Sequence, residues 1–278
     1  MSAKIRSQEA SKLYEQLRDK ILWAQEQGKT VRVRLYCYSH GGNVGLNLGA
    51  VRTMHFPRDT FYIETLVLIG TPIQRETDYL VCHPIFQHVY HIYSRADRIQ
   101  TLDCFSFKRF FSRRRFKSCR RYEIPKNLKQ IEVRLRDFCK GKWYDRSPGH
   151  IELWFFGWPE HKKSLYRPHF PFYPLPMAIF VPNIIEIVNN YSKENHVVLE
   201  LRPTEHRASV RTRHRYDRVW IDFLSQQQIN QLCLYASQQK PGQLDSESYN
   251  CHMQAAANLA QALTKELQHK KGESLCGS

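Results

Sequence analysis

Apolar residues follow a helical period at the start of the chain and form shorter, β-branched runs after it. Apolar or small residues recur every three or four positions from Ala10 to Ala24, and Gly28 follows as a typical C-terminal cap. Residues 31–37 (VRVRLYC) are short and valine-rich, which indicates a strand. The glycine-containing segment SHGGNVGLNLGAV comes next and has helical potential through Val51. The start of the chain therefore predicts a helix, a strand and a second helix.

Three further apolar runs predict strands. They lie at residues 64–70 (ETLVLIG), 88–93 (HVYHIY) and 130–135 (QIEVRL). The connections between them are long enough to hold helices. This alternation predicts the α/β class, with a mostly parallel sheet flanked by helices.

The second half of the chain is less regular. Residues 151–158 (IELWFFGW) are strongly aromatic and lead into a proline-rich stretch. The elements expected after it are a short helix at 184–188 following Pro182, strands at 197–201 and 218–223, a basic connection at 207–215 and a final helix at 253–267. We interpret residues 1–190 as an α/β core and residues 191–278 as an extension of strands and helix that could pack on the same domain.

The chain carries a large positive charge. Lys and Arg total 42 against 26 Asp and Glu, which gives a net charge of +16 and a pI near 9.6. Apolar residues make up 42% and charged residues 24%, so wholesale disorder and collagen-like repeats are excluded. A basic protein attracts nucleic acid, anionic lipid or an acidic substrate, but its charge says nothing about its fold.

Cysteine spacing and hydropathy bear on location. The 8 cysteines lack the close pairs of a zinc site, so reduced thiols in an intracellular protein are expected. The N-terminal sequence MSAKIRSQEASKLYEQL has no apolar run, and no signal peptide is expected. Residues 168–185 lack charge over almost membrane-spanning length, but their prolines argue against a spanning helix. The prediction is a cytoplasmic protein, or one peripheral to a membrane, without a transmembrane segment.

The most informative segment is the junction where the strand at 31–37 runs into the sequence YSHGG. Ser39 becomes a nucleophile if a strained strand-to-helix turn presents it and a base takes its proton. Small residues two before and two after it, Cys37 and Gly41, let the backbone turn. The backbone N–H of His40, at the start of the helix, can donate to an oxyanion. A glycine-rich turn with a solvated serine is the alternative.

This segment resembles the Gly-x-Ser-x-Gly motif of the α/β-hydrolase superfamily, in its lipase and esterase branch. Cys37 replaces the first glycine, and Gly41 is the second. The next strand ends in Gly70-Thr71-Pro72, as it commonly does in the family. The resemblance covers about residues 5–160. It implies an α/β-hydrolase-like fold and a Ser-His-Asp triad that needs no metal or organic cofactor.

The resemblance extends to the triad acid. The sequence HIYSRADRI is similar to the strand and loop that present this acid in the family, which implies Asp97. Asp97 follows a predicted parallel strand, at the edge where α/β sheets gather their ligands. Asp103 and Asp78 are weaker candidates. Alternatively, Asp97 caps a turn or pairs with Arg95 or Arg98.

The triad base follows the acid in this fold. His150 fits best, because the turn Pro148-Gly149 delivers it and an aromatic segment that could exclude water comes after it. His161 and His169 are alternatives. The order Ser39, Asp97, His150 matches the family.

The sequence departs from the family before the serine. In the family, several strands and an oxyanion loop precede the helix that leads to the serine strand. This sequence begins with that helix. We therefore expect an N-terminally shortened member without the second oxyanion donor, at a cost of about 2.7–4 kcal/mol of transition-state stabilisation. The strand at 31–37 should also lie near a sheet edge, unless the strands near Val197 and Val219 cover it.

A basic run, KRFFSRRRFKSCRR, occupies residues 108–121. Its phenylalanines are interleaved with cations, a composition that can neutralise phosphates while aromatic rings insert or stack. The predicted anion-binding patch consists of Lys108, Arg109, Arg113, Arg114, Arg115, Lys117, Arg120 and Arg121. A solvated surface loop is the alternative.

Two functions follow from these patterns. The leading one is a serine hydrolase of carboxylic esters, of lipid or acyl type. The other is a catalytically inactive hydrolase-like protein that binds an anionic partner through the basic run. The partners expected are an ester or lipid substrate and an anionic membrane surface. Nucleic acid is less favoured, because no zinc finger, RRM signature or helix-turn-helix pattern accompanies the basic run.

Overall fold

The computed structural model describes most of the chain as far as residue 228. The described residues are 3–98, 100, 112–139, 142–150, 153, 155–156, 175–202, 207–212, 219–223, 225 and 227–228. The chain divides into two compact units, Met1–Ser225 and Gln226–Ser278. Nearly all described residues belong to the first unit. The final helix predicted at 253–267 lies outside them.

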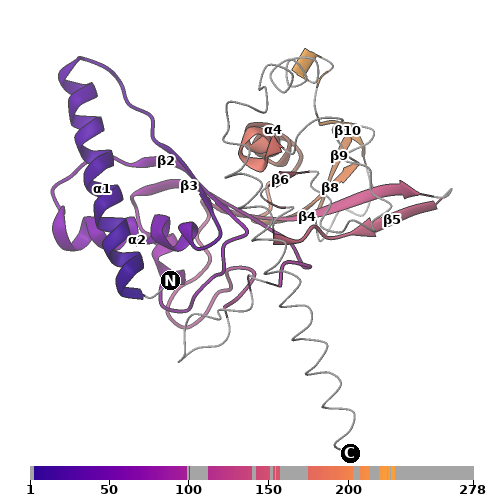
Figure 1. Cartoon of the computed structure of the whole chain (residues 1–278), viewed down its shortest axis with the longest axis horizontal. Coiled ribbons are helices and arrows are strands. Elements are labelled where there is room, and N and C mark those ends of the chain that lie inside the picture. The colour runs from indigo at the N-terminus through magenta and orange to yellow at the C-terminus, as the bar shows by residue number, and fades with distance from the viewer. Residues whose placement is uncertain are drawn as a thin grey trace, which may run out of the picture. The chain divides into compact units, whose positions relative to one another are not determined.

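Helical elements and strands alternate from α1 to β3, and strands predominate among the described elements that follow (Figure 1). The helical elements are α1 (Ala3–Glu26), α2 (Gly41–His55), the 3-10 helix η1 (Asp78–Cys82) and α4 (Met177–Tyr191). The strands are β1 (Arg34–Tyr38), β2 (Ile63–Ile69), β3 (Phe86–Tyr93), β4 (Leu128–Cys139), β5 (Lys142–Arg146), β6 (Phe155–Phe156), β7 (Leu175–Pro176), β8 (His196–Arg202), β9 (Arg207–Arg211) and β10 (Ile221–Asp222).

Among the described residues, 8 strands form one sheet in the order β1-β2-β3-β4-β8-β9-β10, with β5 paired to β4. Strands β1, β2, β3, β4 and β8 run parallel, whereas β5, β9 and β10 are antiparallel to their neighbours. The short strands β6 and β7 pair separately. The prediction of the α/β class with a mostly parallel sheet is confirmed.

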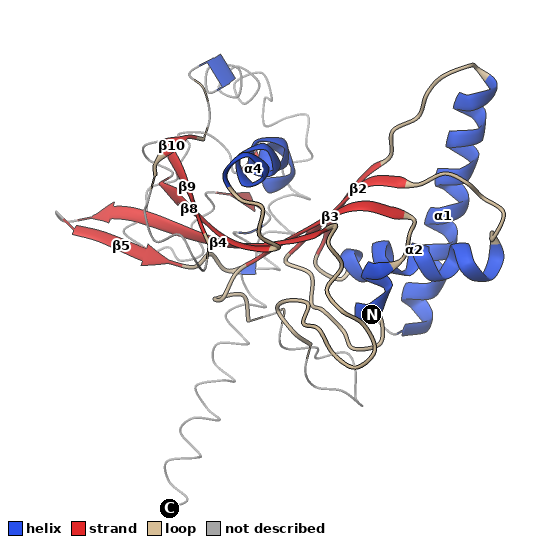
Figure 2. Cartoon of the chain, turned by 180° about the vertical axis from the view of Figure 1, so that it is seen from behind, coloured by secondary structure: helices blue, strands red, loops and turns tan. Residues whose placement is uncertain are grey.

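The helices cover opposite faces of this sheet. A Cβ on Gly45 of α2 would lie 2.9 Å from Cys37 Sγ and 3.3 Å from Leu66 Cδ1, so α2 lies against the face that these two residues share. On the other face, Asn189 of α4 donates to the Tyr90 hydroxyl at 2.9 Å. Figure 2 shows α1 and α2 near β2 and β3, and α4 near β8. Each helix therefore buries only part of the sheet.

The predicted first helix is confirmed as α1, which packs against α2. Its fully buried Tyr14 stacks on Phe56 with ring centroids 4.9 Å apart, and its hydroxyl donates to Asp59 at 3.1 Å. Gly28 has a φ of +69°, and the N–H of Lys29 donates to a helix carbonyl, as expected of a glycine C-cap. This cap turns the chain toward β1.

The expectation that the strand at 31–37 lies near a sheet edge is confirmed within the described residues, and the strands near Val197 and Val219 do not cover that edge. Strand β8 pairs with β4 on the far side of the sheet, and β9 and β10 extend the sheet beyond it. The α4 helix returns the chain to lie parallel beside β4, so the strands that follow add to that side. In the described part of the chain, β1 pairs only with β2.

The second half holds more regular structure than its pattern predicted. The helix expected at 184–188 runs from Met177 to Tyr191 and includes Pro182. The basic connection expected at 207–215 contains β9, whose arginines alternate with the buried Ala208 and Val210. The strand at 218–223 is only β10, and β5 was not predicted. Strands β8 to β10, placed in the extension by sequence, join the sheet of the core.

Candidate active site

Ser39 occupies the tight turn between β1 and α2. Its φ is +51°, and it is the one non-glycine residue with positive φ in the part of the chain that the structure describes. Its N–H donates to the Ile69 carbonyl at 2.9 Å, and its carbonyl accepts from Gly42 at 3.0 Å. A side chain in this backbone region is strained, and such strain clusters at functional sites. These bonds hold the turn and present the hydroxyl at the end of the strand.

The three predicted triad residues meet at this turn. The Nε2 atom of His150 lies 3.0 Å from Ser39 Oγ, and its Nδ1 lies 2.7 Å from Asp97 Oδ2. The carboxylate is fully buried, and the side chain of His150 is only 9% exposed. A serine next to an imidazole that a buried carboxylate orients is the geometry of nucleophilic acyl transfer. The structure places these side chains together, and their catalytic role stays a prediction.

Both the carboxylate and the backbone carbonyl of Asp97, the predicted triad acid, accept hydrogen bonds. Asp97 Oδ1 accepts the backbone N–H of Gln100 at 3.1 Å, so the carboxylate caps a turn and also faces His150. The Asp97 carbonyl accepts Arg114 Nε at 3.0 Å. Arg95 pairs instead with Glu132, at 2.9 Å. The alternatives of turn cap and triad acid are therefore not exclusive.

The base is packed between glycine and tyrosine. Gly70 has a φ of +58°, and a Cβ there would lie 3.3 Å from two atoms of the His150 ring and 3.4 Å from Asp97 Oδ2. The Tyr38 ring stacks on the imidazole with centroids 4.8 Å apart. The Ser94 hydroxyl donates to the carbonyl of Pro148, two residues before the base. Sequence reasoning noted Gly70 only as part of a motif and assigned no role to Tyr38.

Cys37 fits the position where the family motif has glycine because α2 leaves room for it. A Cβ added to Gly45 of α2 would lie only 2.9 Å from Cys37 Sγ. Because Gly45 has no side chain, the helix leaves room for the thiol. Burial raises the pKa of Cys37 to about 12, which keeps the thiol neutral. It therefore does not compete with Ser39 as a nucleophile. Cys82 and Cys119 are also free thiols.

The other candidate residues lie elsewhere. Asp78, in η1, pairs with Arg121 at 3.2 Å, and burial raises its pKa. Asp103, His161 and His169 lie outside the described residues. His40 is the N-cap residue of α2, with helical φ and ψ, so its backbone stands at the helix start as the oxyanion prediction requires. In the described part of the chain β1 pairs only with β2. No described strand therefore pairs with the outer edge of β1, the strand that ends next to Ser39.

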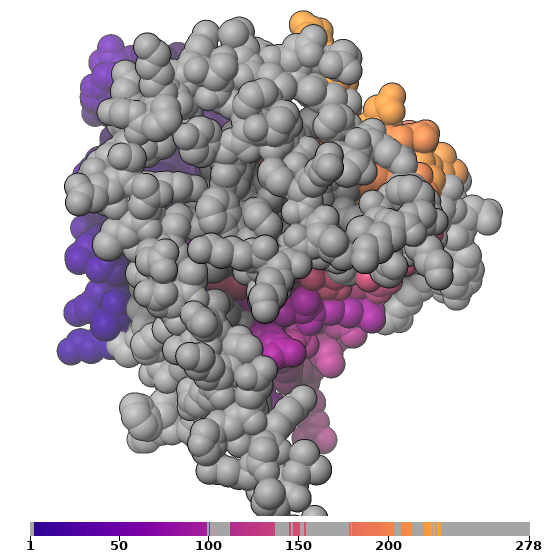
Figure 3. Space-filling model, turned by 45° about the vertical axis from the view of Figure 1, so that its right-hand side comes forward, coloured from indigo at the N-terminus to yellow at the C-terminus, as the bar shows by residue number. Residues whose placement is uncertain are grey.

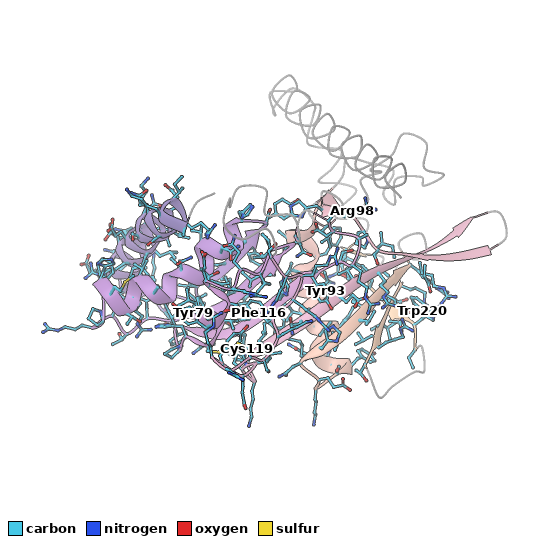
Figure 4. The ribbon with its side chains drawn as sticks, turned by 90° about the horizontal axis from the view of Figure 1, so that it is seen from below. Tyr79, Tyr93, Arg98, Phe116, Cys119 and Trp220 are labelled. Atoms are coloured by element: carbon cyan, nitrogen blue, oxygen red, sulfur yellow. The ribbon has the colours of Figure 1, made fainter. Side chains whose placement is uncertain are left out.

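The described residues of the basic run lie in different environments. Arg114 binds the Asp97 carbonyl, and Arg121 binds Asp78 and lies 5.9 Å from the centre of the Tyr79 ring. Lys117 and Arg120 are exposed. Arg113 and Arg115 are half-buried, while Lys108 and Arg109 lie outside the described residues. Figure 4 labels Tyr79, the aromatic side chain over which the Arg121 guanidinium lies. Part of the predicted anion-binding patch therefore supports the fold.

Within the described residues, no three side chains of His, Cys, Asp or Glu gather as metal ligands would. None of the helices described is both long enough and apolar enough to cross a membrane. Comparison with protein-family models, curated proteins and solved structures finds no match to this chain. The geometry at Ser39 is therefore the ground for a functional assignment.

Proposed function

We propose that the protein is a serine hydrolase of carboxylic esters with an α/β-hydrolase-like fold. The observation that carries this proposal is the line of hydrogen bonds from Ser39 Oγ through His150 to Asp97 at a strained strand-to-helix turn. A chance cluster of polar residues has no need of positive φ at the serine, or of a glycine beside the histidine. The basic charge and the lipase-like motif favour a lipid or acyl ester as substrate.

The chemistry follows from these positions. Ser39 Oγ attacks the ester carbonyl while His150 Nε2 takes its proton, and Asp97 stabilises the imidazolium that results. His150 then gives the proton to the leaving alcohol. Water hydrolyses the acyl-enzyme by the same exchange, which returns Ser39 to its starting state. The backbone N–H of His40 is the oxyanion donor in this scheme.

Hydrolysis of a short p-nitrophenyl ester tests the proposal. Ser39→Ala should abolish turnover and leave the fold intact, because a turn serine contributes little to packing. Ser11→Ala is the matched control, since this α1 serine donates only to a helix carbonyl. Equal turnover by wild type and Ser39→Ala would show that any esterase activity comes from elsewhere.

The second candidate is a catalytically inactive hydrolase-like protein that binds an anionic partner. The exposed Lys117 and Arg120 on the turn after Phe116 favour it. Changing Lys117 and Arg120 to Gln should weaken binding to anionic vesicles and flatten its salt dependence, because fewer counterions are released. An unchanged binding isotherm would show that Lys117 and Arg120 do not bind the anionic partner and belong to a solvated surface turn.

A further inference from the structure

Tyr38 contacts the proposed base in two ways that the triad alone does not require. Its ring stacks on the imidazole of His150, with centroids 4.8 Å apart and planes inclined at 30°. Its hydroxyl donates to the carbonyl oxygen of the same residue at 3.0 Å. One side chain therefore holds both the ring and the backbone of His150.

The chain around His150 explains why such support matters. His150 stands beyond β5, on a segment that begins with the turn Pro148-Gly149, whereas Tyr38 is the last residue of β1. A residue of the sheet thus anchors one that a loop carries. Since Tyr38 also precedes Ser39, the same turn fixes the positions of nucleophile and base relative to each other.

The stacked geometry also acts on charge. An aromatic face within about 6 Å of a cation attracts it through the ring quadrupole. During acyl transfer His150 becomes an imidazolium, and the Tyr38 ring lies at this range. We propose that Tyr38 is a positioning residue that holds His150 against Ser39 and stabilises its protonated form. This inference rests on the proposed function, which assigns His150 as the base.

Two substitutions separate the two contacts. Tyr38→Phe removes the hydroxyl and keeps the ring, and should lower kcat about fivefold through the lost hydrogen bond. Tyr38→Leu removes both, and should lower kcat by a further factor of about five. Tyr36, two residues earlier on the same face of β1, is 37% exposed. Tyr36→Phe and Tyr36→Leu are therefore matched controls and should keep wild-type kcat.

The decisive readout is the titration of the His150 ring, followed by NMR in a Ser39→Ala background. The signal is assigned by its loss in His150→Gln. Loss of the Tyr38 ring should move the titration midpoint about half a pH unit lower, because the protonated form loses its aromatic contact. Tyr38→Phe should leave the midpoint in place, and Tyr38→Met serves as the ring-free variant if the leucine protein does not fold.

This measurement needs no turnover, so it stands apart from the proposed function. A protein without Ser39-dependent hydrolysis would overturn the hydrolase proposal, and the titration would still report on the Tyr38 contact. Equal midpoints in the tyrosine, phenylalanine and leucine proteins would overturn charge stabilisation by the ring. Unchanged kcat in Tyr38→Leu would overturn the positioning role.

Discussion

The face of the sheet that carries α2 is built in two different ways. Over β1 to β3 it is apolar and helix-covered, with Leu66, Leu68 and Val89 fully buried. Over β4, β8 and β9 the same face carries charge, and the buried carboxylates of Glu132 and Glu200 lie beneath arginines. Figure 3 shows residues of the β9 and β10 region, in orange, at the surface.

The difference concerns how each half fixes its side chains. Near the triad, residues are held by close packing and by backbone positions with positive φ, at Ser39 and Gly70, so single substitutions should have large effects. In the charged half, Arg134 and Arg95 share Glu132, and Arg211 binds Glu200 at 2.6 Å. Most of these arginines keep some contact with water, so replacing a single charge should have a smaller effect.

The largest effect is expected from Asp97→Asn. The amide keeps the shape of the side chain but loses the carboxylate that orients and stabilises the His150 ring, so kcat should fall by about 10⁴-fold with KM little changed. Steady-state ester hydrolysis measures this. Asp59→Asn, at the carboxylate that Tyr14 contacts, is the control. A loss confined to KM would assign Asp97 to binding.

A smaller but still large effect is expected from Gly70→Ala. A Cβ there would lie 3.3 Å from the His150 ring, so the base must shift by a few tenths of an ångström, and kcat should fall roughly tenfold. Gly28→Ala is the matched control, because Gly28 also has positive φ but nothing lies within 4 Å of its added Cβ. Control and variant should both lose about 1–2 kcal/mol of stability from backbone strain. Equal activities would show that Gly70 serves conformation alone.

His91, in the apolar half of the sheet, should make the free energy of unfolding depend on pH. It lies on the α2 face with its ring edge-on to Phe116, and burial lowers its pKa to about 3. In the unfolded chain the His91 side chain binds a proton near pH 6.5, which the folded protein does not bind until about pH 3. As pH falls from about 6 to 3, the free energy of unfolding should therefore fall by about 1.4 kcal/mol per pH unit. Urea unfolding of wild type and His91→Gln at several pH values measures the slope. The same acid slope in both proteins would remove His91 as its cause.

Glu200 should give the charged half a slope of the opposite sign, with the smallest effect of the four. Burial raises its pKa above 4.5 despite the nearby arginines, so its contribution to stability falls as pH rises through the folded-state value. Glu200→Gln should remove this dependence and change stability at neutral pH by less than about 1 kcal/mol. Arg211→Ala should cost more, because it leaves a buried carboxylate without its ion pair. Similar losses in the two variants would contradict this view.

The sequence was most informative where local pattern and tertiary structure agree. The runs at 64–70 and 88–93 become β2 and β3, and the strand, serine and glycine-rich helix start appear as a strained turn. Strand β9 escaped prediction because its arginines resembled a charged loop, although Ala208 and Val210 alternate with them. The wider period-2 pattern was the signal that could have found it.

Other features depend on contacts between distant residues, which no local pattern carries. Tyr38 and His150 lie far apart in the chain, and only the fold shows that one stacks on the other. The basic run looked uniform, yet Arg114 and Arg121 bind internal partners whereas Lys117 and Arg120 face solvent. Charge composition does not distinguish these two environments.

Covalent labelling tests the central claim most directly. A fluorophosphonate reacts with a serine whose hydroxyl is activated by a neighbouring base, and mass spectrometry of the digested protein identifies the residue modified. The account predicts one adduct, on Ser39, that is lost in His150→Ala and retained in Ser11→Ala. An unlabelled protein, or an adduct on Ser39 that forms as fast in His150→Ala as in wild type, would contradict it.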